Sequence, residues 1–412
     1  MPDKNRLFYG YIIVVLCFLA MMVVLGLHSS FGIFIKPVLI DFQWTRAVIS
    51  GAFSLSQIAH GLFGIAMGGL SDKYGPRVAM TICGLLSGIG YLLMSQVESI
   101  WQLYLFYGVI IGAGSSVFVP LLSTVARWFV KRRSMMTGIV FAGIGVGMLV
   151  LPVIIDRLIS TYDWRITFAI LGITIMVVVI ITAQFLKRDP GQAGYTAYSE
   201  DNTVQRNMKL ETKSFSLRDA VHTRQFWMLF TILVCYGYCF FSIQVHIVPY
   251  VTDLGISTSS AAAILATVGG ATIIGQTVLG STGDKIGNRQ AFLIGIVLIV
   301  LTGLGLMVTG ELWAFFCIAA ILGIAFGDCG TQESPLVAWL FGLASHGVIF
   351  GFMGFGFTVG AAIGPLLTAH IFDVTGSYWL AFLICTALAL IATILTIFLS
   401  SPISESAQNF TD

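Results

Sequence analysis

The sequence predicts an all-α membrane protein whose twelve transmembrane helices form two pseudo-symmetric six-helix bundles. Hydrophobic residues make up 57% of the 412 residues and charged residues only 10%, whereas a soluble chain needs roughly 25% charged residues. Most of the surface must therefore face lipid. Apolar runs long enough to cross a bilayer recur along the whole chain, and one short motif occurs twice, about half a chain length apart.

The apolar runs predict where each helix lies. A crossing helix needs about 20 mostly apolar residues, and helices satisfy their own backbone hydrogen bonds in lipid. The first run is longer than the roughly 7–15 residues of a signal-peptide core, so we expect a retained helix. The predicted spans are 9–35, 46–70, 78–96, 101–129, 134–156, 165–186, 226–250, 259–283, 290–309, 313–341, 346–371 and 378–400.

The distribution of lysine and arginine predicts the orientation. With a cytoplasmic N-terminus, 17 of the 21 Lys and Arg residues fall in cytoplasmic segments, as the positive-inside rule requires. We therefore expect a multi-pass protein of a prokaryotic inner (cell) membrane with both termini in the cytoplasm. The net charge of +2 gives no general attraction to nucleic acid.

One long polar segment divides the spans six and six. Its mixed charges and turn-forming residues cannot bury much apolar surface, which is typical of a linker. The predicted domains are an N-terminal bundle (1–187), a cytoplasmic linker (188–225) and a C-terminal bundle with a short tail (226–412).

A repeated motif indicates that the chain is a duplicated unit. GGLSDKYGPR (68–77) and GSTGDKIGNR (280–289) share five residues at an offset of 212, and Gly138, Gly147 and Pro152 recur 213 residues later. Internal repeats of this kind mark repeated structural units. We interpret the charged motif residues as a conformational latch that breaks and re-forms as two halves rock; the alternative is a simple topology anchor. The latch residues are Asp72, Lys73, Arg77, Asp284, Lys285 and Arg289.

Twelve helices, the six-plus-six repeat and G-x-x-x-D-K-x-G-x-R in both halves resemble the major facilitator superfamily. The stretches FYGYIIVVLCFL, SFGIFIKPVLIDFQWTRAVISGAFSL, ARWFVKRRSMMTGIVFAGIGVG and AAIGPLLTAHIFDVTGSYWLAFLI are similar to its monocarboxylate transporter and oxalate–formate antiporter branch. The resemblance covers the chain apart from the central loop and the tail. It implies secondary transport by alternating access.

Two acidic residues inside the tenth span are predicted to lie on the transport pathway, because ionisable groups in a membrane are costly and usually functional. Asp328 lies at or beyond the midplane and Glu333 nearer the cytoplasm. Five residues along a helix separate their directions by about 140°, so a simple dyad is not expected. We interpret Asp328 as a proton carrier; a structural carboxylate is the alternative. Nearby glycines and Pro335 predict a loosened helix.

Polar residues of the first and seventh spans complete the predicted pathway, because the resemblance implies that these helices line the cavity. A histidine can bind a carboxylate or relay a proton. The branch has a basic residue at the position of Gln276 and the animal monocarboxylate transporters have a lysine at Ser29, so the expected cations are missing. The candidates are His28, Ser29, Gln244, His246 and Gln276.

These features predict a secondary transporter of a small organic solute, expected to be a monocarboxylate, with proton coupling (symport). The alternative is a proton-coupled transporter or exporter of a neutral or cationic molecule, which the missing cations favour. No nucleotide-binding loop or hydrolase motif occurs, and the seven cysteines have no zinc spacing. We therefore expect no enzymatic activity, cofactor or metal, with a solute, H⁺ and the lipid bilayer as partners. Solute identity, direction, stoichiometry and oligomeric state stay open.

Overall fold

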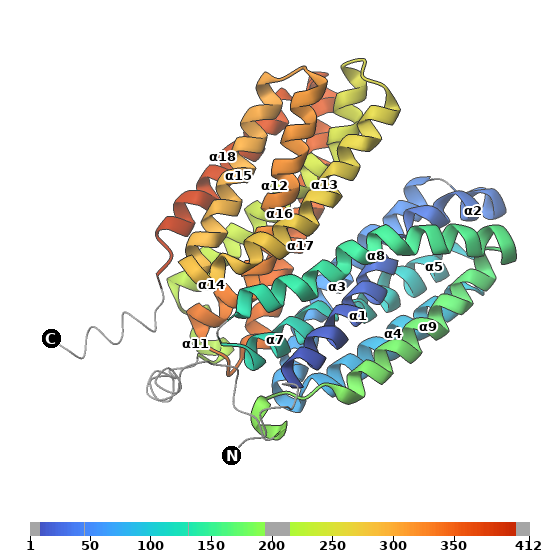
Figure 1. Ribbon diagram of the computed structural model, residues 1–412. Helices are drawn as coiled ribbons and strands as arrows, with labels where there is room; N and C mark the ends of the chain where they lie inside the picture. The colour runs from blue at the N-terminus through green and yellow to red at the C-terminus, as the bar shows by residue number, and fades with distance from the viewer. Residues whose placement is uncertain (1–8, 45, 131, 194–214, 401–412) are drawn as a thin grey trace. The chain divides into compact units, whose positions relative to one another are not determined.

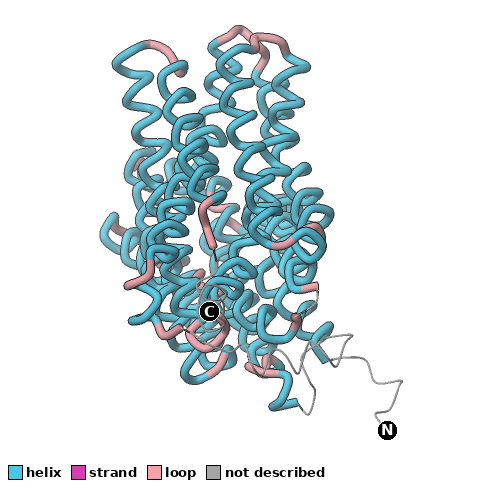
Figure 2. Tube along the Cα trace, turned by 90° about the vertical axis from the view of Figure 1, so that its left-hand side faces the viewer, coloured by secondary structure: helices cyan, strands magenta, loops and turns pink. Residues whose placement is uncertain are grey.

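The computed structural model describes residues 9–44, 46–130, 132–193 and 215–400, and helices account for nearly all of them (Figures 1 and 2). Within the described ranges, twelve helical segments, from Tyr9–Phe34 to Trp379–Ile397, are long and apolar enough to cross a membrane. The predicted spans are therefore confirmed. The middle of the predicted linker, residues 194–214, lies outside the described residues.

The chain forms two compact units. Unit 1 comprises Met1–Thr212 together with His346–Gly351, and unit 2 comprises Lys213–Ser345 together with Phe352–Asp412. The elements of residues 9–193 are α1 (Tyr9–Ser29), α2 (Gly32–Phe42), α3 (Arg46–Tyr74), α4 (Pro76–Met94), α5 (Ile100–Leu103), η1 (Tyr104–Ile111), α6 (Gly112–Gly114), α7 (Phe118–Trp128), α8 (Arg133–Tyr162), α9 (Trp164–Phe185) and η2 (Pro190–Ala193).

The second half of the chain contains the matching set of spans. Its elements are α11 (Leu217–Val221), α12 (Arg224–Asp253), α13 (Thr258–Val278), η3 (Leu279–Ser281), α14 (Gly283–Ile286), α15 (Asn288–Val308), α16 (Leu312–Phe341), α17 (His346–Thr375) and α18 (Trp379–Ile397). Outside the spans, α11 begins at a capping box in which Ser216 Oγ donates to Asp219 Oδ2 at 2.6 Å. The hydrogen bonds from Ser216 lower the pKa of Asp219.

Helix packing inside each unit follows the sequence repeat. The third span packs on the sixth, α4 on α9 in unit 1 and α15 on α18 in unit 2. The fourth span contacts both the second and the third: η1 touches α3 and α4, and α16 touches α13 and α15. Figure 1 shows α4 and α9 side by side. The duplication seen in the sequence therefore extends to these helix contacts.

Two repeated glycines allow helices to approach closely. A Cβ added at Gly147 of α8 would collide with the carbonyl oxygen of Met22 in α1. At the equivalent position, a Cβ at Gly360 of α17 would collide with the carbonyl oxygen of Val234 in α12. Small residues at membrane-helix interfaces let backbones touch in this way, so both echoed glycines have a packing role.

The repeated motif forms the same turn twice. Gly75 and Gly287 precede α4 and α15 with φ of 90° and 97°, values that residues with a Cβ rarely adopt. The motif arginines have equivalent partners at the ends of the sixth and twelfth spans. Arg77 donates to the carbonyl of Gln184, and Arg289 Nη1 donates to the carbonyl of Leu399 at 3.0 Å.

The fourth span is interrupted, whereas the tenth is one continuous α-helix with Pro335 inside it. Tyr104–Ile111 forms a π-helix, and a turn at residues 115–117 separates α6 from α7. The prediction of a loosened tenth span is wrong, since α16 continues from Leu312 to Phe341. Gly327 serves close packing instead, because a Cβ there would meet the backbone of Thr272 and Gln276 in α13.

Candidate functional site

The first motif aspartate binds the N-terminal end of α17 inside unit 1. Asp72 Oδ1 accepts from the backbone N–H of Gly347 at 3.0 Å, and Oδ2 accepts from Val348 at 2.9 Å. Arg127 of α7 donates to Asp72 Oδ1 at 2.7 Å, with 9% and 11% of the two side chains exposed. A helix N-terminus has free N–H groups and a partial positive charge, so it suits a carboxylate.

The other motif side chains lie in more open surroundings. Asp284 and Lys285 are exposed in α14, and Lys73 is exposed with its ammonium 5.1 Å from the ring centroid of Tyr74. Arg127 also reaches Asp189 at 3.7 Å. The two halves of the predicted latch therefore differ at the aspartate: Asp72 is largely buried, whereas Asp284 is exposed.

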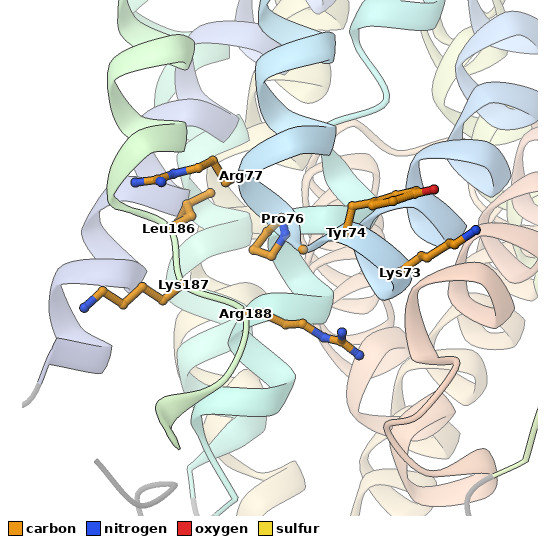
Figure 3. A pocket seen from close by; sticks show the side chains of 8 residues that line it. Lys73, Tyr74, Pro76, Arg77, Leu186, Lys187 and Arg188 are labelled. Carbon is orange, nitrogen blue, oxygen red and sulfur yellow. The ribbon is translucent and has the colours of Figure 1, made fainter. Parts of the chain in front are cut away.

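A cavity of about 380 Å³ adjoins the first motif turn and carries four basic residues: Lys73, Arg77, Lys187 and Arg188. Figure 3 shows that their charged ends do not converge, since Arg77 and Lys187 point one way and Lys73 and Arg188 point another. Lys187 Nζ lies 4.9 Å from the ring centroid of Tyr9. The cavity is therefore lined by basic residues, but their charged groups do not point to one place where a ligand could bind.

The tenth span brings its acids into a buried polar cluster of unit 2. Asp328 is 1% exposed and Glu333 is 5% exposed. Gln332, one turn after Asp328, donates to Asp328 Oδ1 at 3.3 Å. Both acids interact electrostatically with the buried phenol of Tyr236 in α12, whose hydroxyl donates to the carbonyl of Phe326 at 3.1 Å.

Three oxygens in this part of unit 2 have no hydrogen-bond partner within the described ranges: Asp328 Oδ2, Gln332 Oε1 and Gln276 Oε1. Gln276 is 1% exposed, and its backbone lies against Gly327, the neighbour of Asp328. Buried polar atoms are normally paired. Unpaired acceptors beside an acid are suited to a proton or a hydrogen-bond donor.

The seventh-span candidates lie on α12, where His246 is about one turn before Pro249. His246 is 8% exposed, and its Nε2 donates to the carbonyl of Pro365 at 3.0 Å. Its Nδ1 is buried without a partner among the residues that the structure places. Gln244 is half-buried on the same helix. Since a carbonyl can only accept, the neutral ring carries its hydrogen on Nε2.

The two first-span candidates in unit 1 differ in burial. His28 is 4% exposed and its Nε2 lies 2.9 Å from Ser56 Oγ of α3. Ser29 is exposed at the end of α1. Unit 1 thus holds His28, and unit 2 holds His246, Gln276 and the two acids.

Sequence reasoning missed several polar partners. Gln332 had a readable signal, since it follows Asp328 by four residues, the spacing of neighbours on a helix face. Tyr236 and Ser56 had none, because their contacts join distant helices. His346 is not among the predicted site residues; it is fully buried, and its Nδ1 lies 3.0 Å from Ser123 Oγ, beside the Asp72 cluster in unit 1.

Known proteins similar to this chain are membrane transporters. Rat monocarboxylate transporter 13 is 26% identical over 408 residues, covering 94% of this chain and 88% of that protein. The oxalate:formate antiporter of Oxalobacter formigenes is 28% identical over 254 residues, covering 61% and 57%. The crystal structure of the human organic anion transporter MFSD10 aligns with a TM-score of 0.74 at 14% identity, covering 94% and 99%, and shows the same fold.

The family match extends over most of the chain. Residues 11–337 and 271–411 match the sequence pattern of the Major Facilitator Superfamily. The resemblance to its monocarboxylate and oxalate–formate branch is confirmed by the relatives above, and the protein is a multi-pass membrane transporter, not an enzyme. The twelve-span fold, the duplicated motif and this match agree: the chain belongs to the Major Facilitator Superfamily.

Proposed function

We propose that this transporter moves a small monocarboxylate together with protons by alternating access. The names of the relatives support the solute class. In this proposal the N-terminal bundle (1–187) and the C-terminal bundle (226–412), joined by the linker 188–225, are the moving bodies. The motif residues of the two bundles act as the latch.

The buried acid of the tenth span carries the proton-coupling part of the proposal. Asp328 is 1% exposed and receives a weak 3.3 Å bond from Gln332 at Oδ1. Its Oδ2 lies against Gly295 of α15 but has no well-formed hydrogen bond in the described part of unit 2. No lysine or arginine side chain forms an ion pair with it among the interactions of the described residues. A charged carboxylate in such surroundings is costly, so this carboxyl is suited to binding and releasing a proton.

A neutral or cationic solute is the second candidate, favoured by one observation. Gln276 and Ser29 replace the cations that the branch places at these positions, and Gln276 Oε1, Asp328 Oδ2 and Gln332 Oε1 are acceptors without donors in the described structure. Such a set would suit an amine or hydroxyl group.

Reconstituted proteoliposomes with an imposed pH gradient test the proposal. Labelled pyruvate or lactate is offered beside amines and neutral solutes. One pH unit stores about 1.4 kcal/mol per proton, so each coupled proton supports roughly tenfold accumulation. We expect accumulation of the monocarboxylate by the wild-type protein. Gradient-driven uptake of amines or neutral solutes alone would instead establish the second candidate.

Asp328→Asn tests the proton role separately. The amide cannot release a proton, so we expect pyruvate accumulation to vanish while exchange of labelled for unlabelled pyruvate continues. Glu311→Gln is the matched control, because Glu311 is an exposed acid at the start of the same helix. Full accumulation by Asp328→Asn would show that another group carries the coupled proton.

A further inference from the structure

The fourth span is broken halfway along its length, where a second set of polar side chains gathers in unit 1. The span runs from Ile100 to Trp128, and residue 114 is its middle. The π-helix Tyr104–Ile111 and the turn at residues 115–117 interrupt it there. Irregular backbone at membrane depth is tolerated only where protein or a water-filled cavity surrounds it, and π-helices are frequent at functional sites.

Three serines, two at this break and one in α3, form hydrogen bonds with a pair of histidines, His28 of α1 and His60 of α3. Ser115 Oγ lies 3.0 Å from His60 Nδ1, and Ser116 Oγ donates to the carbonyl of His60 at 2.9 Å. Ser56 Oγ lies 2.9 Å from His28 Nε2. Both histidines are thus held by hydroxyl groups, each at a single ring nitrogen.

The serine hydrogen bonds determine which nitrogen of each ring carries the hydrogen. Ser56 donates its one hydrogen to the carbonyl of Phe53 at 2.7 Å, so it must accept from His28 Nε2. Ser115 donates to the carbonyl of Gly112 at 2.8 Å, so it must accept from His60 Nδ1. The heavy-atom network therefore assigns opposite tautomers. The lone pairs left for a proton are on Nδ1 of His28 and Nε2 of His60.

The two rings are close and nearly parallel, with centroids 6.5 Å apart and planes inclined by 21°. His28 also stacks on Phe53 at 5.4 Å and on Tyr107 at 5.9 Å, and His60 is the ionisable group that acts on it electrostatically. Like charges at this separation repel strongly in a protein interior. The pair can therefore accept one proton far more easily than two.

Among the side chains that the structure describes in unit 1, no ion pair involves His28 or His60. The titratable groups that face it are the phenol of Tyr107 in η1 and, next to that phenol, Tyr91 of α4. α8 meets α1 near this level through Gly147 and Leu151, which contact Gly26. The Lys and Arg residues of the spans in unit 1 lie at or near span ends.

We propose that His28 and His60 form a single-proton site that supplies the positive counter-charge for a monocarboxylate. The transport part of this inference rests on the proposed function; the proton site itself does not. One proton enters the pair from water as the anion binds, on whichever ring nitrogen has a free lone pair, and gives an imidazolium in the middle of unit 1. This charge replaces the cation missing at Ser29, which follows His28 in α1.

The proton site is tested without any solute by ¹⁵N NMR of ¹⁵N-histidine-labelled full-length protein in lipid nanodiscs. The chain has only six histidines, and His28→Gln and His60→Asn assign two of them. We expect the neutral His28 ring to carry its hydrogen on Nε2 and the neutral His60 ring to carry it on Nδ1. On acidification, the two rings together should bind one proton before any second proton binds. Identical tautomers, or two independent titrations, would overturn the site. Ser115→Ala is a milder variant. It removes the hydroxyl that fixes the hydrogen on His60 Nδ1, so it should change the tautomer of His60 and leave that of His28 unchanged.

The counter-charge role is tested with the same two substitutions combined. The glutamine and asparagine amides retain the N–H groups donated to Ser56 and Ser115 but cannot take up a proton. We expect the KM for pyruvate at acidic pH to rise at least tenfold and to lose its pH dependence, while exchange at saturating pyruvate stays within twofold. His222→Gln, an exposed histidine at the end of α11, should behave as wild type.

A pH dye in a weakly buffered nanodisc sample measures the number of protons taken up per pyruvate bound. Wild type should take up one more proton per pyruvate bound than the double variant, in which Asp328 is intact. An unchanged KM with the same proton uptake as wild type in the double variant would refute the counter-charge role. Absence of pyruvate binding by wild type, with the NMR result intact, would refute the proposed solute and the counter-charge role while leaving the proton site standing.

Discussion

At the scale of the residue, Asp72 shows how a largely buried carboxylate is stabilised near a membrane surface. It accepts hydrogen bonds from Arg127 and from two backbone N–H groups at the start of α17. Charge-assisted hydrogen bonds are roughly twice as strong as neutral ones. Its repeat partner Asp284 is exposed, so the same motif residue has two different environments.

Replacing Asp72 by Asn should slow the transport cycle without removing solute binding. The amide keeps one acceptor oxygen but loses the charge that Arg127 and the helix N-terminus stabilise, a loss of about 1.5–3 kcal/mol. We expect a turnover about tenfold or more lower in exchange assays, with ligand-induced thermal stabilisation retained. Asp284→Asn should have a smaller effect because its side chain is exposed. If turnover of Asp72→Asn equals that of wild type, the motif acts only as a topology anchor.

At the scale of the element, contacts between helices depend on glycines placed where two backbones meet. Gly147 and Gly360 occupy equivalent positions and contact the backbone of the first helix of their own unit. Gly269 of α13 differs, because a Cβ at this exposed glycine would have no other atom within 4 Å. Some glycines of the spans are therefore needed for close helix packing, and others are not.

Alanine at these positions should separate the two roles. In Gly147→Ala or Gly360→Ala the new methyl group collides with a carbonyl oxygen, and overpacking costs about 1–3 kcal/mol. Gly269→Ala removes backbone freedom without a collision and should gain up to about 1 kcal/mol. Thermal unfolding in detergent measures the order, with both packing variants below wild type and Gly269→Ala at or above it. Equal midpoints for all three would mean that the helices can shift to make room.

At the scale of the whole molecule, the twelve spans, the repeat and the charge distribution give one topology. Most lysines and arginines fall on one side when the termini are cytoplasmic. An even number of spans returns the chain to the side from which it started. The orientation therefore applies to both termini together.

Epitope tags at the two termini should be digested together by protease added to inside-out vesicles and protected in right-side-out cells. A tag inserted at Asp163, between α8 and α9, should show the opposite pattern. Digestion of the two terminal tags in different preparations would contradict an even number of spans, and protection of both in inside-out vesicles would reverse the proposed orientation.

The sequence by itself determined the spans, the duplication and the family, because these depend on local properties. Whether a segment can enter lipid follows from its own twenty or so residues, and the motif turns need glycine at residues 75 and 287 because of their own φ angles. The acids of the tenth span were identifiable for the same reason, since an ionisable residue within an apolar run stands out in any context.

Only the tertiary structure decided which polar groups meet. His60 and Ser115 are 55 residues apart, and Asp72 lies 275 residues before Gly347, so no local pattern indicates either pair. The π-helix of the fourth span lies in an ordinary apolar run, YLFYGVII, whose composition resembles that of a regular helix. Conversely, the glycines near Asp328 suggested a loosened helix, but Gly327 serves close packing against α13. Such features depend on packing between distant helices. The sequence of one helix does not show which side chains of another helix it will meet.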